Sequence, residues 1–344
     1  MTATHAAKEA GDAPSLAPLI DMLSADMAGV NATIINRMAS EVPLIPKLAG
    51  HLIASGGKRI RPMMAVAGAM LGNGDEVVRA RAIKLATAVE FIHSATLLHD
   101  DVIDESKLRR GQDTANALWG NDASVLVGDF LFARAFELMV EANDITVLGR
   151  LAAAAARITE GEIRQMAITG QPDTPVEDYF DVIGGKTAVL FSAAAAAGIE
   201  ITGAPATQVE AMRVYGMELG MAFQIMDDAL DYTASAEQMG KNAGDDFADQ
   251  KITLPTILAW QDGDAGERAF WQRTLGEATF AEGDLERART LLAAHDAVNR
   301  SVAVAHDHAV KAGAALAPFI SDDRTAPLAR ALADAALFAA HRAS

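Results

Sequence analysis

The sequence predicts an all-α protein, and three observations support this fold class. Hydrophobic residues make up 51% of the 344 residues, but aromatic residues make up only 5%. Alanine is abundant along the whole chain, and alanine favours helices, whereas strands favour aromatic and β-branched residues. Apolar residues recur at helical spacing in long segments, and no Gly-, Ser- or Pro-rich linker separates two halves. We therefore expect one helical domain over residues 16–344.

The first predicted helix runs from Leu16 to Ser40, and Pro43 and Pro46 end it. Its apolar residues at helical spacing are Leu19, Met22, Leu23, Met27, Val30, Ile34 and Ile35. The second begins near Pro62, because proline suits a first helical turn, and closes at Gly72 to Gly74. Further helices are expected over Val77–Asp104, Ala123–Glu141, Ile145–Ile168, Thr187–Gly198 and Ala206–Asp231, followed by shorter ones between Leu254 and His341.

Composition and hydropathy exclude several classes of protein. Residues 1–15 lack the apolar segment of a secretory signal, and we expect a disordered tail there. The longest apolar stretch, Val189–Ile199, is too short to span a bilayer. Cysteine is absent, which excludes disulfides and thiolate metal sites. We expect a cytoplasmic protein without a transmembrane segment.

The formal net charge is −17, which argues against binding to nucleic acids or to anionic membranes. Only 29 Lys and Arg residues serve the chain. Any local cluster of these cations is therefore informative, because a bound polyanion would depend on a few positions.

Two acidic motifs lie on apolar helices. In the first, Asp100 and Asp104 flank Asp101 and are four residues apart, so they share a helix face. In the second, Asp227 and Asp231 have the same spacing. Paired carboxylates repel each other unless a cation intervenes, and oxygen ligands without Cys or His suit Mg²⁺. A solvated acidic surface is the alternative for one motif, but two copies favour a magnesium site.

Basic residues cluster around these motifs. Glycines at 56–57 precede Lys58 and Arg61 at a helix start, a geometry that favours anions. Arg109 and Arg110 follow the first acidic motif, and Gly184–Thr187 interrupts one helix and begins another. Lys241 and Lys251 flank Gly244-Asp245-Asp246. Each cation alone could be a solvated surface residue, but together they indicate sites for two diphosphates.

From about Leu16 onwards the chain resembles the trans-isoprenyl diphosphate synthases (polyprenyl synthetases), most closely the long-chain members that make quinone side chains. The shared motifs keep the order and spacing of the family. They are GGKRIRP at 56–62, EFIHSATLLHDDVIDESKLRRG at 90–111, GGKT at 184–187, FQIMDDALDY at 223–232, and GKNAGDD with KITLP at 240–255. The resemblance implies an all-α bundle around a central hydrophobic pocket.

The resemblance also implies roles for individual residues. Asp100, Asp104 and Asp227 would hold the Mg²⁺ ions, three with substrate bound, and Asp101 and Asp231 would support them, Asp231 as a further ligand. The allylic diphosphate would contact Arg109, Lys186 and Lys241. Isopentenyl diphosphate would bind to Lys58, Arg61, His93 and Arg110, although a core role for His93 is an alternative. Thr187 and Gln224 would face the developing allylic cation.

Lys251 is a further substrate-binding candidate. Family members often carry Arg or Glu before this lysine, whereas the preceding residues here are Phe247-Ala248-Asp249-Gln250. That departure weakens the case for a direct contact between Lys251 and substrate.

The implied reaction is a Mg²⁺-dependent prenyl transfer. Ionisation of an allylic diphosphate, with farnesyl or geranylgeranyl diphosphate as primer, gives a cation that the alkene of isopentenyl diphosphate attacks, and the diphosphate accepts the final proton. Clustered Mg²⁺ and cationic side chains stabilise the charge on the leaving group, and apolar helices exclude water. The expected partners are these two diphosphates and no nucleic acid, with transient membrane contact for product release.

Four other functions compete with this interpretation. A short-chain farnesyl or geranylgeranyl diphosphate synthase has the same motifs. A terpene cyclase would not need the isopentenyl site that Lys58, Arg61 and Arg110 represent. A non-catalytic subunit of a heteromeric synthase would have lost an acidic motif, whereas both are intact. An acidic interaction protein would not explain the interleaved cations.

The resemblance also predicts product length and assembly. Short-chain relatives often carry a bulky aromatic residue near Ala95 or Ile92, which lie one to two turns before Asp100 and would be wall positions down the hydrophobic pocket. Since the small side chains of Ala95 and Thr96 would not block the growing prenyl chain in the pocket, we expect a product of about eight to ten isoprene units for quinone synthesis. Phe132, Phe136 and Met139, at helical spacing on the next long helix, either form the floor of the product pocket or are ordinary core residues. We expect a homodimer with contacts on Ala123–Glu141.

Overall fold

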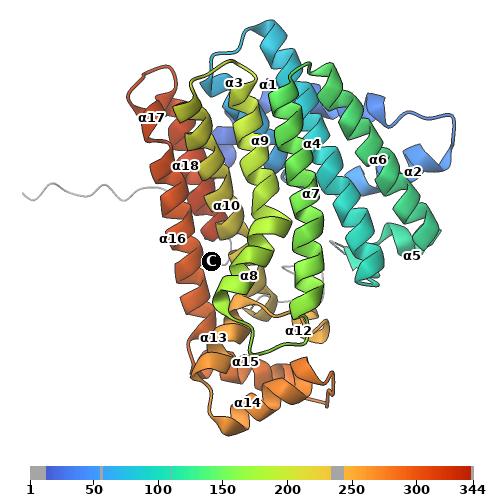
Figure 1. Cartoon of the computed structure of the whole chain (residues 1–344), viewed down its shortest axis with the longest axis vertical. Helices are drawn as coiled ribbons and strands as arrows, with labels where there is room; N and C mark the ends of the chain where they lie inside the picture. The colour runs from blue at the N-terminus through green and yellow to red at the C-terminus, as the bar shows by residue number, and fades with distance from the viewer. Residues whose placement is uncertain (1–12, 55–56, 110, 234–243, 342–344) are drawn as a thin grey trace, which may run out of the picture.

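The computed structural model describes residues 13–54, 57–109, 111–233 and 244–341, and it confirms the predicted all-α class (Figure 1). The N-terminal half contains α1 (Ala17–Arg37), α2 (Leu44–Ala54), α3 (Ile60–Leu71), α4 (Glu76–Ile103), α5 (Ala115–Trp119), α6 (Asn121–Glu141) and α7 (Ile145–Ile168). The central part contains α8 (Val176–Ile183), a π-helical turn η1 (Gly184–Ala188), α9 (Val189–Glu200) and α10 (Ala206–Thr233). The remainder contains α12 (Asp245–Ala248), α13 (Leu254–Asp262), α14 (Ala265–Trp271), the π-helical turn η2 (Gln272–Gly276), α15 (Asp284–Ala294), α16 (Ala297–Ala315), α17 (Ala317–Ile320) and α18 (Ala326–Ala340).

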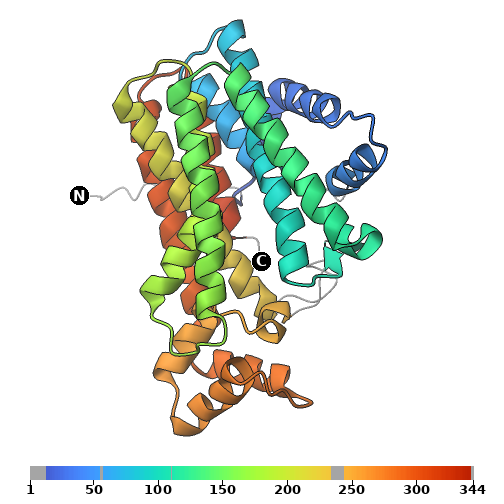
Figure 2. The same cartoon turned by 45° about the vertical axis from the view of Figure 1, so that its right-hand side comes forward.

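Long helices form a roughly parallel set of rods, and the short helices α12 to α15 lie together at one end of it (Figure 2). In the described part of the chain the strands are β1 (Leu108–Arg109) and β2 (Gln112–Asp113), which form a short antiparallel hairpin between α4 and α5. Side-chain caps define where helices begin: Asp75 accepts the Val78 N–H at 2.9 Å before α4.

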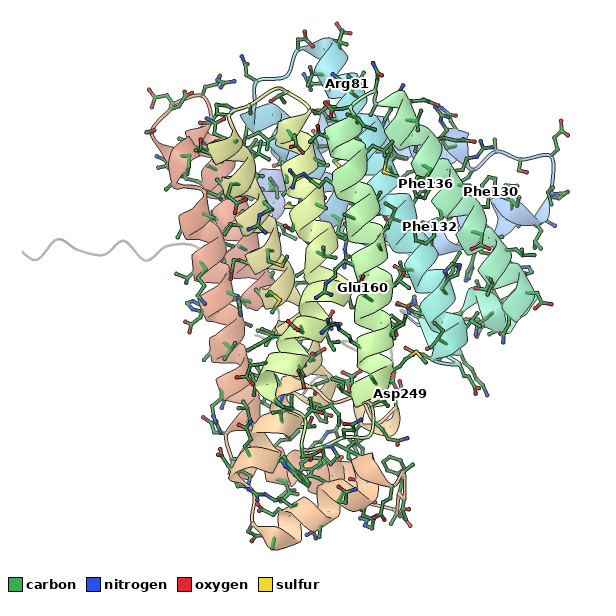
Figure 3. The ribbon with its side chains drawn as sticks, in the orientation of Figure 1. Arg81, Phe130, Phe132, Phe136, Glu160 and Asp249 are labelled. Atoms are coloured by element: carbon green, nitrogen blue, oxygen red, sulfur yellow. The ribbon has the colours of Figure 1, made fainter. Side chains whose placement is uncertain are left out.

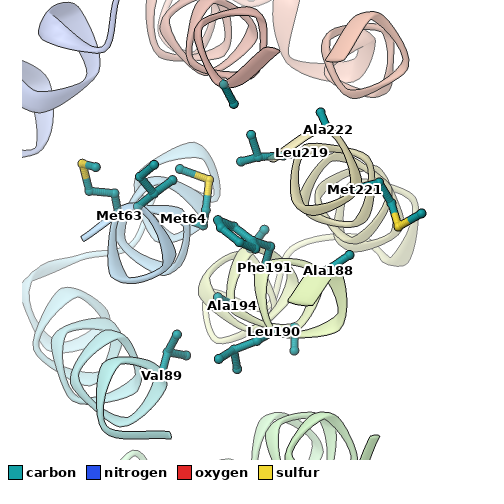
Figure 4. Close-up of a cluster of buried hydrophobic side chains, with 14 of the residues drawn as sticks. Met63, Met64, Val89, Ala188, Leu190, Phe191, Ala194, Leu219, Met221 and Ala222 are labelled. Atoms are coloured by element: carbon teal, nitrogen blue, oxygen red, sulfur yellow. The ribbon is translucent and has the colours of Figure 1, made fainter. Parts of the chain in front are cut away.

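Helix α9 is the centre of the bundle. Every residue from Leu190 to Ile199 is buried, and the helix packs against α3, α4, α7 and α10. Figure 4 shows Phe191 among buried side chains from α3 and α10. A helix that is apolar on all sides belongs in a core.

The same run explains an apparent membrane signal. Among the described residues, Val176–Glu200 is long and apolar enough to cross a membrane by length and composition. However, 83% of its most apolar window is buried inside the fold. This run comprises α8, η1 and the central helix α9, and the apolar stretch Val189–Ile199 of the sequence is its C-terminal part.

Glycines allow the central helices to approach closely. A Cβ on Gly198 would lie 2.0 Å from the carbonyl oxygen of Ala65 in α3, and one on Gly216 of α10 would lie 2.4 Å from the Phe191 carbonyl. Neither distance is compatible with a side chain unless the backbones move. Backbone contact between α9 and its neighbours therefore depends on these small residues.

Several predicted boundaries are wrong. The first helix ends at Arg37, before Pro43, and Pro46 lies inside α2, which the periodicity did not predict. Met22 and Ile35 are exposed, so the buried face of α1 is narrower than expected. The glycines at 184–185 do not break the helix, because the backbone continues through the turn η1.

Gly198→Ala tests the close packing of α9. We expect its free energy of unfolding to fall by about 2 kcal/mol, because the new methyl group collides with the α3 backbone. Gly149→Ala is the matched control, since Gly149 lies on α7 with open space around its Cβ position, and it should be neutral or stabilising by up to about 1 kcal/mol. Urea unfolding measures both; equal stability of Gly198→Ala and wild type would contradict the packing argument.

Candidate active site

A cavity of about 510 Å³ gathers most of the predicted site residues. Its walls come from α3, α4, β1, α7, α8, η1, α10 and the segment from 245 to 253. Ten predicted site residues line it: Arg61, His93, Asp100, Asp104, Arg109, Lys186, Thr187, Gln224, Asp227 and Lys251. Arg110 and Lys241 lie outside the described residues.

The first acidic motif divides between two sides of α4. Asp100 and Asp104, one turn apart at the end of the helix, both line the cavity. Asp101 points elsewhere and is 2% exposed. It accepts hydrogen bonds from Arg109 Nη2 at 2.7 Å and from Nε at 3.0 Å. Asp101 therefore holds the Arg109 guanidinium at the edge of the cavity.

Burial raises the pKa of Asp100 to about 7, although the Lys186 ammonium opposes the shift. The neighbouring carboxylates of Glu162 and Asp104 raise it further. A charged Asp100 is thus unfavourable in this cavity until an additional cation arrives.

The second acidic motif does not present both of its spaced aspartates, Asp227 and Asp231, to the cavity. Asp227 lines the cavity, but Asp231 is fully buried and its Oδ2 accepts the Asp246 N–H at 3.0 Å. The carbonyl oxygen of Asp231 also accepts the Gly244 N–H at 2.9 Å. The structure therefore places Asp231 as an anchor for the chain that follows α10, away from the cavity surface.

The motif reasoning assigned no role to four carboxylates that line the cavity, namely Asp228, Asp245, Asp246 and Asp249. Asp249 lies near the end of α7 (Figure 3). The GDD sequence at 244–246 was the available signal for two of them. Phe247 of α12 packs against Phe270, Trp271 and Phe280, so an aromatic cluster holds this acidic segment in place.

The carboxylates suit Mg²⁺. Their oxygen atoms reach one cavity from α4, α10 and α12 without Cys, and Mg²⁺ prefers oxygen ligands. In the described ranges no three Asp, Glu or His side chains are close enough to hold a metal ion by themselves. An ion here would need water or substrate oxygens to complete its shell, as Mg²⁺ between carboxylates and phosphates commonly does.

Lys186 and Lys251 are both held by carboxylates. Lys186 Nζ lies 2.5 Å from Glu162 Oε2, and sequence reasoning missed Glu162. Gly161 makes this pair possible, because a Cβ there would lie 2.4 Å from the Lys186 backbone nitrogen. Lys251 Nζ lies 3.0 Å from Asp104 and 3.1 Å from Asp249. Burial opposes the charge on Lys251, but Asp246, Asp104 and Asp249 raise its pKa above the ordinary value.

A second basic group lies near the start of α3. Arg61 Nη1 is 3.1 Å from His93 Nε2, and its guanidinium stands 4.3 Å from the centre of the Phe191 ring. Lys58 does not line the cavity, and its ammonium lies 4.5 Å from the Phe338 ring of α18. The structure therefore brings Arg61 and His93 together and places Lys58 beside the C-terminal helix.

A chain of hydrogen bonds crosses the cavity wall. Thr187 Oγ1 donates to Gln224 Oε1 at 2.8 Å, and Gln224 Nε2 donates to Asp228 Oδ1 at 2.8 Å. Tyr179 Oη donates to Asp228 Oδ2 at 2.6 Å. Burial and the adjacent Asp228 carboxylate raise the pKa of Tyr179 well above its ordinary value, so its hydroxyl remains a donor. Sequence reasoning found Thr187 and Gln224 but not Tyr179.

Comparison with known proteins identifies a family and several relatives. The chain matches the family model described as polyprenyl synthetase over residues 42–292. It is 48% identical to a polyprenyl synthase from Caulobacter crescentus CB15, whose crystal structure is complexed with calcium and isoprenyl diphosphate, with a TM-score of 0.92 over 97% of this chain and 100% of that one.

Two further relatives are similar over most of their length. A decaprenyl diphosphate synthase from Rhodobacter capsulatus is 45% identical, with a TM-score of 0.89 over 96% of this chain and 100% of that chain. The octaprenyl diphosphate synthase of Escherichia coli (strain K12) is 45% identical over 253 residues, which are 72% of this chain and 76% of that protein. The family match spans most of the chain and includes both acidic helices. This chain therefore belongs to the polyprenyl synthetase family, as its motifs predicted.

Proposed function

We propose that this chain is an all-trans long-chain polyprenyl diphosphate synthase, a prenyltransferase that adds isopentenyl diphosphate units to an allylic diphosphate primer. The observation that carries the proposal is the convergence of Asp100, Asp104 and Asp227 with Arg109, Lys186 and Lys251 around one cavity. Acidic residues alone would repel a diphosphate, and basic residues alone would not hold Mg²⁺. The combination suits a metal–diphosphate complex.

The allylic diphosphate is assigned to the acidic end of the cavity. Asp100, Asp104 and Asp227 would hold Mg²⁺, in a set of three ions with substrate bound, and Arg109, Lys186 and Lys251 would contact the diphosphate oxygens. When bound, Mg²⁺ supplies electrostatic stabilisation of the leaving diphosphate. Asp231 acts through the backbone it anchors, since its carboxylate accepts the Asp246 N–H. Lys241 keeps its sequence-based assignment to this site.

Isopentenyl diphosphate is assigned to Arg61 and His93, with Lys58 and Arg110 as further contacts. The hydrogen-bonding distance between Arg61 and His93, and the stacking of Arg61 on Phe191, limit how far this guanidinium moves. Two separate cationic sites are what a condensation of two diphosphates requires.

The reaction needs no protein nucleophile. Thr187 and Gln224 line the same cavity and would present oxygen atoms to the allylic cation, while the buried apolar residues of α4 and α9 exclude water. The diphosphate that leaves the primer would accept the final proton.

The long product distinguishes this proposal from a short-chain synthase. The relatives named for octaprenyl and decaprenyl products support about eight to ten isoprene units, consistent with quinone side chains. Ala95 and Ile92 are fully buried and do not line the 510 Å³ cavity, so their role as wall positions for the growing product stays a prediction. Phe136 is not a floor, because it is 45% exposed on α6. Phe132 stacks on His99, and Met139 is buried.

A homodimer would cover the exposed apolar face of α6. Leu126, Phe136 and Val140 are 66%, 45% and 63% exposed and follow helical spacing with Ala133. Figure 3 labels Phe136 on α6. Exposed apolar faces of this kind mark interaction surfaces.

We also propose the cytoplasm as the location, residues 16–344 as one synthase domain after a short tail, and transient contact with a membrane during product release.

The first prediction tests the proposed activity. With Mg²⁺, isopentenyl diphosphate and farnesyl diphosphate, the purified chain should release pyrophosphate and form polyprenyl products. Asp100→Asn should lower turnover about a thousandfold because it removes a metal ligand, whereas the exposed Asp21→Asn control should match wild type. Inactive wild type, or near-normal Asp100→Asn, would refute the assignment.

The same variant should be more stable than wild type without metal. Asp100 has a folded pKa of about 7 against an ordinary value of 3.8, so ionisation above pH 4 favours the unfolded chain progressively until about pH 7. Asp100→Asn removes this penalty. Its melting temperature relative to wild type should therefore rise between pH 4 and pH 7 and stay constant above, and a flat difference would contradict the shift.

Ala95→Phe tests product length. Ala95 is fully buried on α4, and a phenyl group there should shorten the product to roughly farnesyl or geranylgeranyl length by blocking growth. Ala80→Phe, on the exposed start of the same helix, should leave the length unchanged. The measurement is the chain length of the product alcohols, and an unchanged length distribution for Ala95→Phe would rule out Ala95 as a wall of the product pocket.

Phe136→Glu tests the dimer. Placing a charge on the proposed interface should shift the chain from twice its monomer mass to monomer in light scattering. Ile20→Glu, an equally exposed apolar site on α1 at 46%, should remain dimeric. A monomeric wild type at micromolar concentration would exclude this assembly.

A further inference from the structure

Asp228 follows Asp227 in the second acidic motif, and both of its carboxylate oxygens accept hydrogen bonds from other side chains. Its Oδ2 accepts the Tyr179 hydroxyl at 2.6 Å, and its Oδ1 accepts the Gln224 side-chain N–H at 2.8 Å. Asp228 is 6% exposed and Tyr179 is 1% exposed. Hydrogen bonds to a carboxylate are strong when water is excluded, so this pair of contacts holds the carboxylate firmly.

The carboxylate decides which way the Gln224 amide points. An ionised carboxylate only accepts hydrogen bonds, so Gln224 must turn its NH₂ group toward Asp228. Its carbonyl oxygen then faces Thr187, whose hydroxyl donates to it at 2.8 Å. A flipped amide would place NH₂ beside Thr187 and a carbonyl oxygen beside the Asp228 carboxylate, and the second contact would be repulsive. The contact with Asp228 thus fixes the direction of the amide dipole.

The direction matters because all four residues line the cavity in which the prenyl transfer is proposed. A carbonyl oxygen stabilises a nearby carbocation, whereas an NH₂ group carries positive partial charge and destabilises it. The benefit arises when the cation forms, so it lowers the barrier without strengthening substrate binding.

We infer that Tyr179 and Asp228 are positioning residues for the condensation, which act together through Gln224 by holding its carbonyl oxygen toward the developing allylic cation. The inference rests on the proposed function. Tyr179 reaches Asp228 from α8, 49 residues away in sequence, and it restrains the carboxylate at the oxygen that Gln224 does not contact.

Tyr179→Phe tests the inference because it removes only the hydroxyl group. We expect kcat to fall about tenfold, as for one hydrogen bond to a charged group, with the KM of both diphosphates changed less than about twofold. Tyr215→Phe is the matched control: Tyr215 is also fully buried, and it donates to the Leu332 carbonyl at 2.9 Å outside the cavity. It should lose comparable thermal stability and retain wild-type kcat.

A double-mutant cycle separates positioning from general support of the fold. In a Gln224→Ala background, Tyr179→Phe should have almost no further effect on kcat, since the amide it orients is absent. Asp228→Asn, which can face Gln224 with either end of its amide, should lower kcat and show the same dependence on Gln224. If Tyr179→Phe does not fold, this variant carries the test.

The outcomes are distinct. An inactive wild-type chain overturns the proposed function. Active wild type with normal kcat in Tyr179→Phe overturns the positioning role alone, as does a tenfold fall that persists in the Gln224→Ala background or appears mainly as a raised KM. A tenfold fall in kcat that disappears in that background supports it.

Discussion

The rest of this site depends on pairing buried carboxylates with cations. Desolvation and mutual repulsion both disfavour several acidic side chains around one cavity. In the structure Asp101 is paired with Arg109, Glu162 with Lys186, and Asp104 with Lys251. Asp100 is in a different position, because its pKa is raised to about 7 despite the nearby Lys186. The cavity therefore favours added positive charge beside Asp100.

The packing of the central helix α9 positions two of the side chains that line the cavity. Helix α9 is buried along its length and continues through the π-helical turn η1 into α8. Since η1 carries Lys186 and Thr187, the position of α9 against α3 and α10 also sets where these two side chains enter the cavity. A π-helical turn inserts an extra residue into a helix and often marks a functional site. Here it redirects the chain without ending the helix.

The aspartates within each acidic motif have different contacts and therefore different roles. Asp100, Asp104 and Asp227 face the cavity, while Asp101 orients an arginine and Asp231 anchors the following segment. Asp228 of α10 accepts hydrogen bonds from Tyr179 of α8 and from Gln224 of its own helix. A run of aspartates in the sequence thus has members that suit metal binding and members that hold other groups in place.

The sequence by itself determined the all-α class, the order of the long helices and the family, because helical periodicity and motif spacing are local properties of the chain. It also identified Asp100, Asp104, Asp227 and Lys186 from residue type. Only the tertiary structure decided that Asp231 is covered while Asp228 lines the cavity. Spacing shows which residues share a helix face, but contacts from Gly244 and Asp246, in another segment of the chain, determine what covers Asp231. Glu162 and Tyr179 reach the site through contacts 24 and 49 residues away in sequence, and no local pattern specifies such contacts.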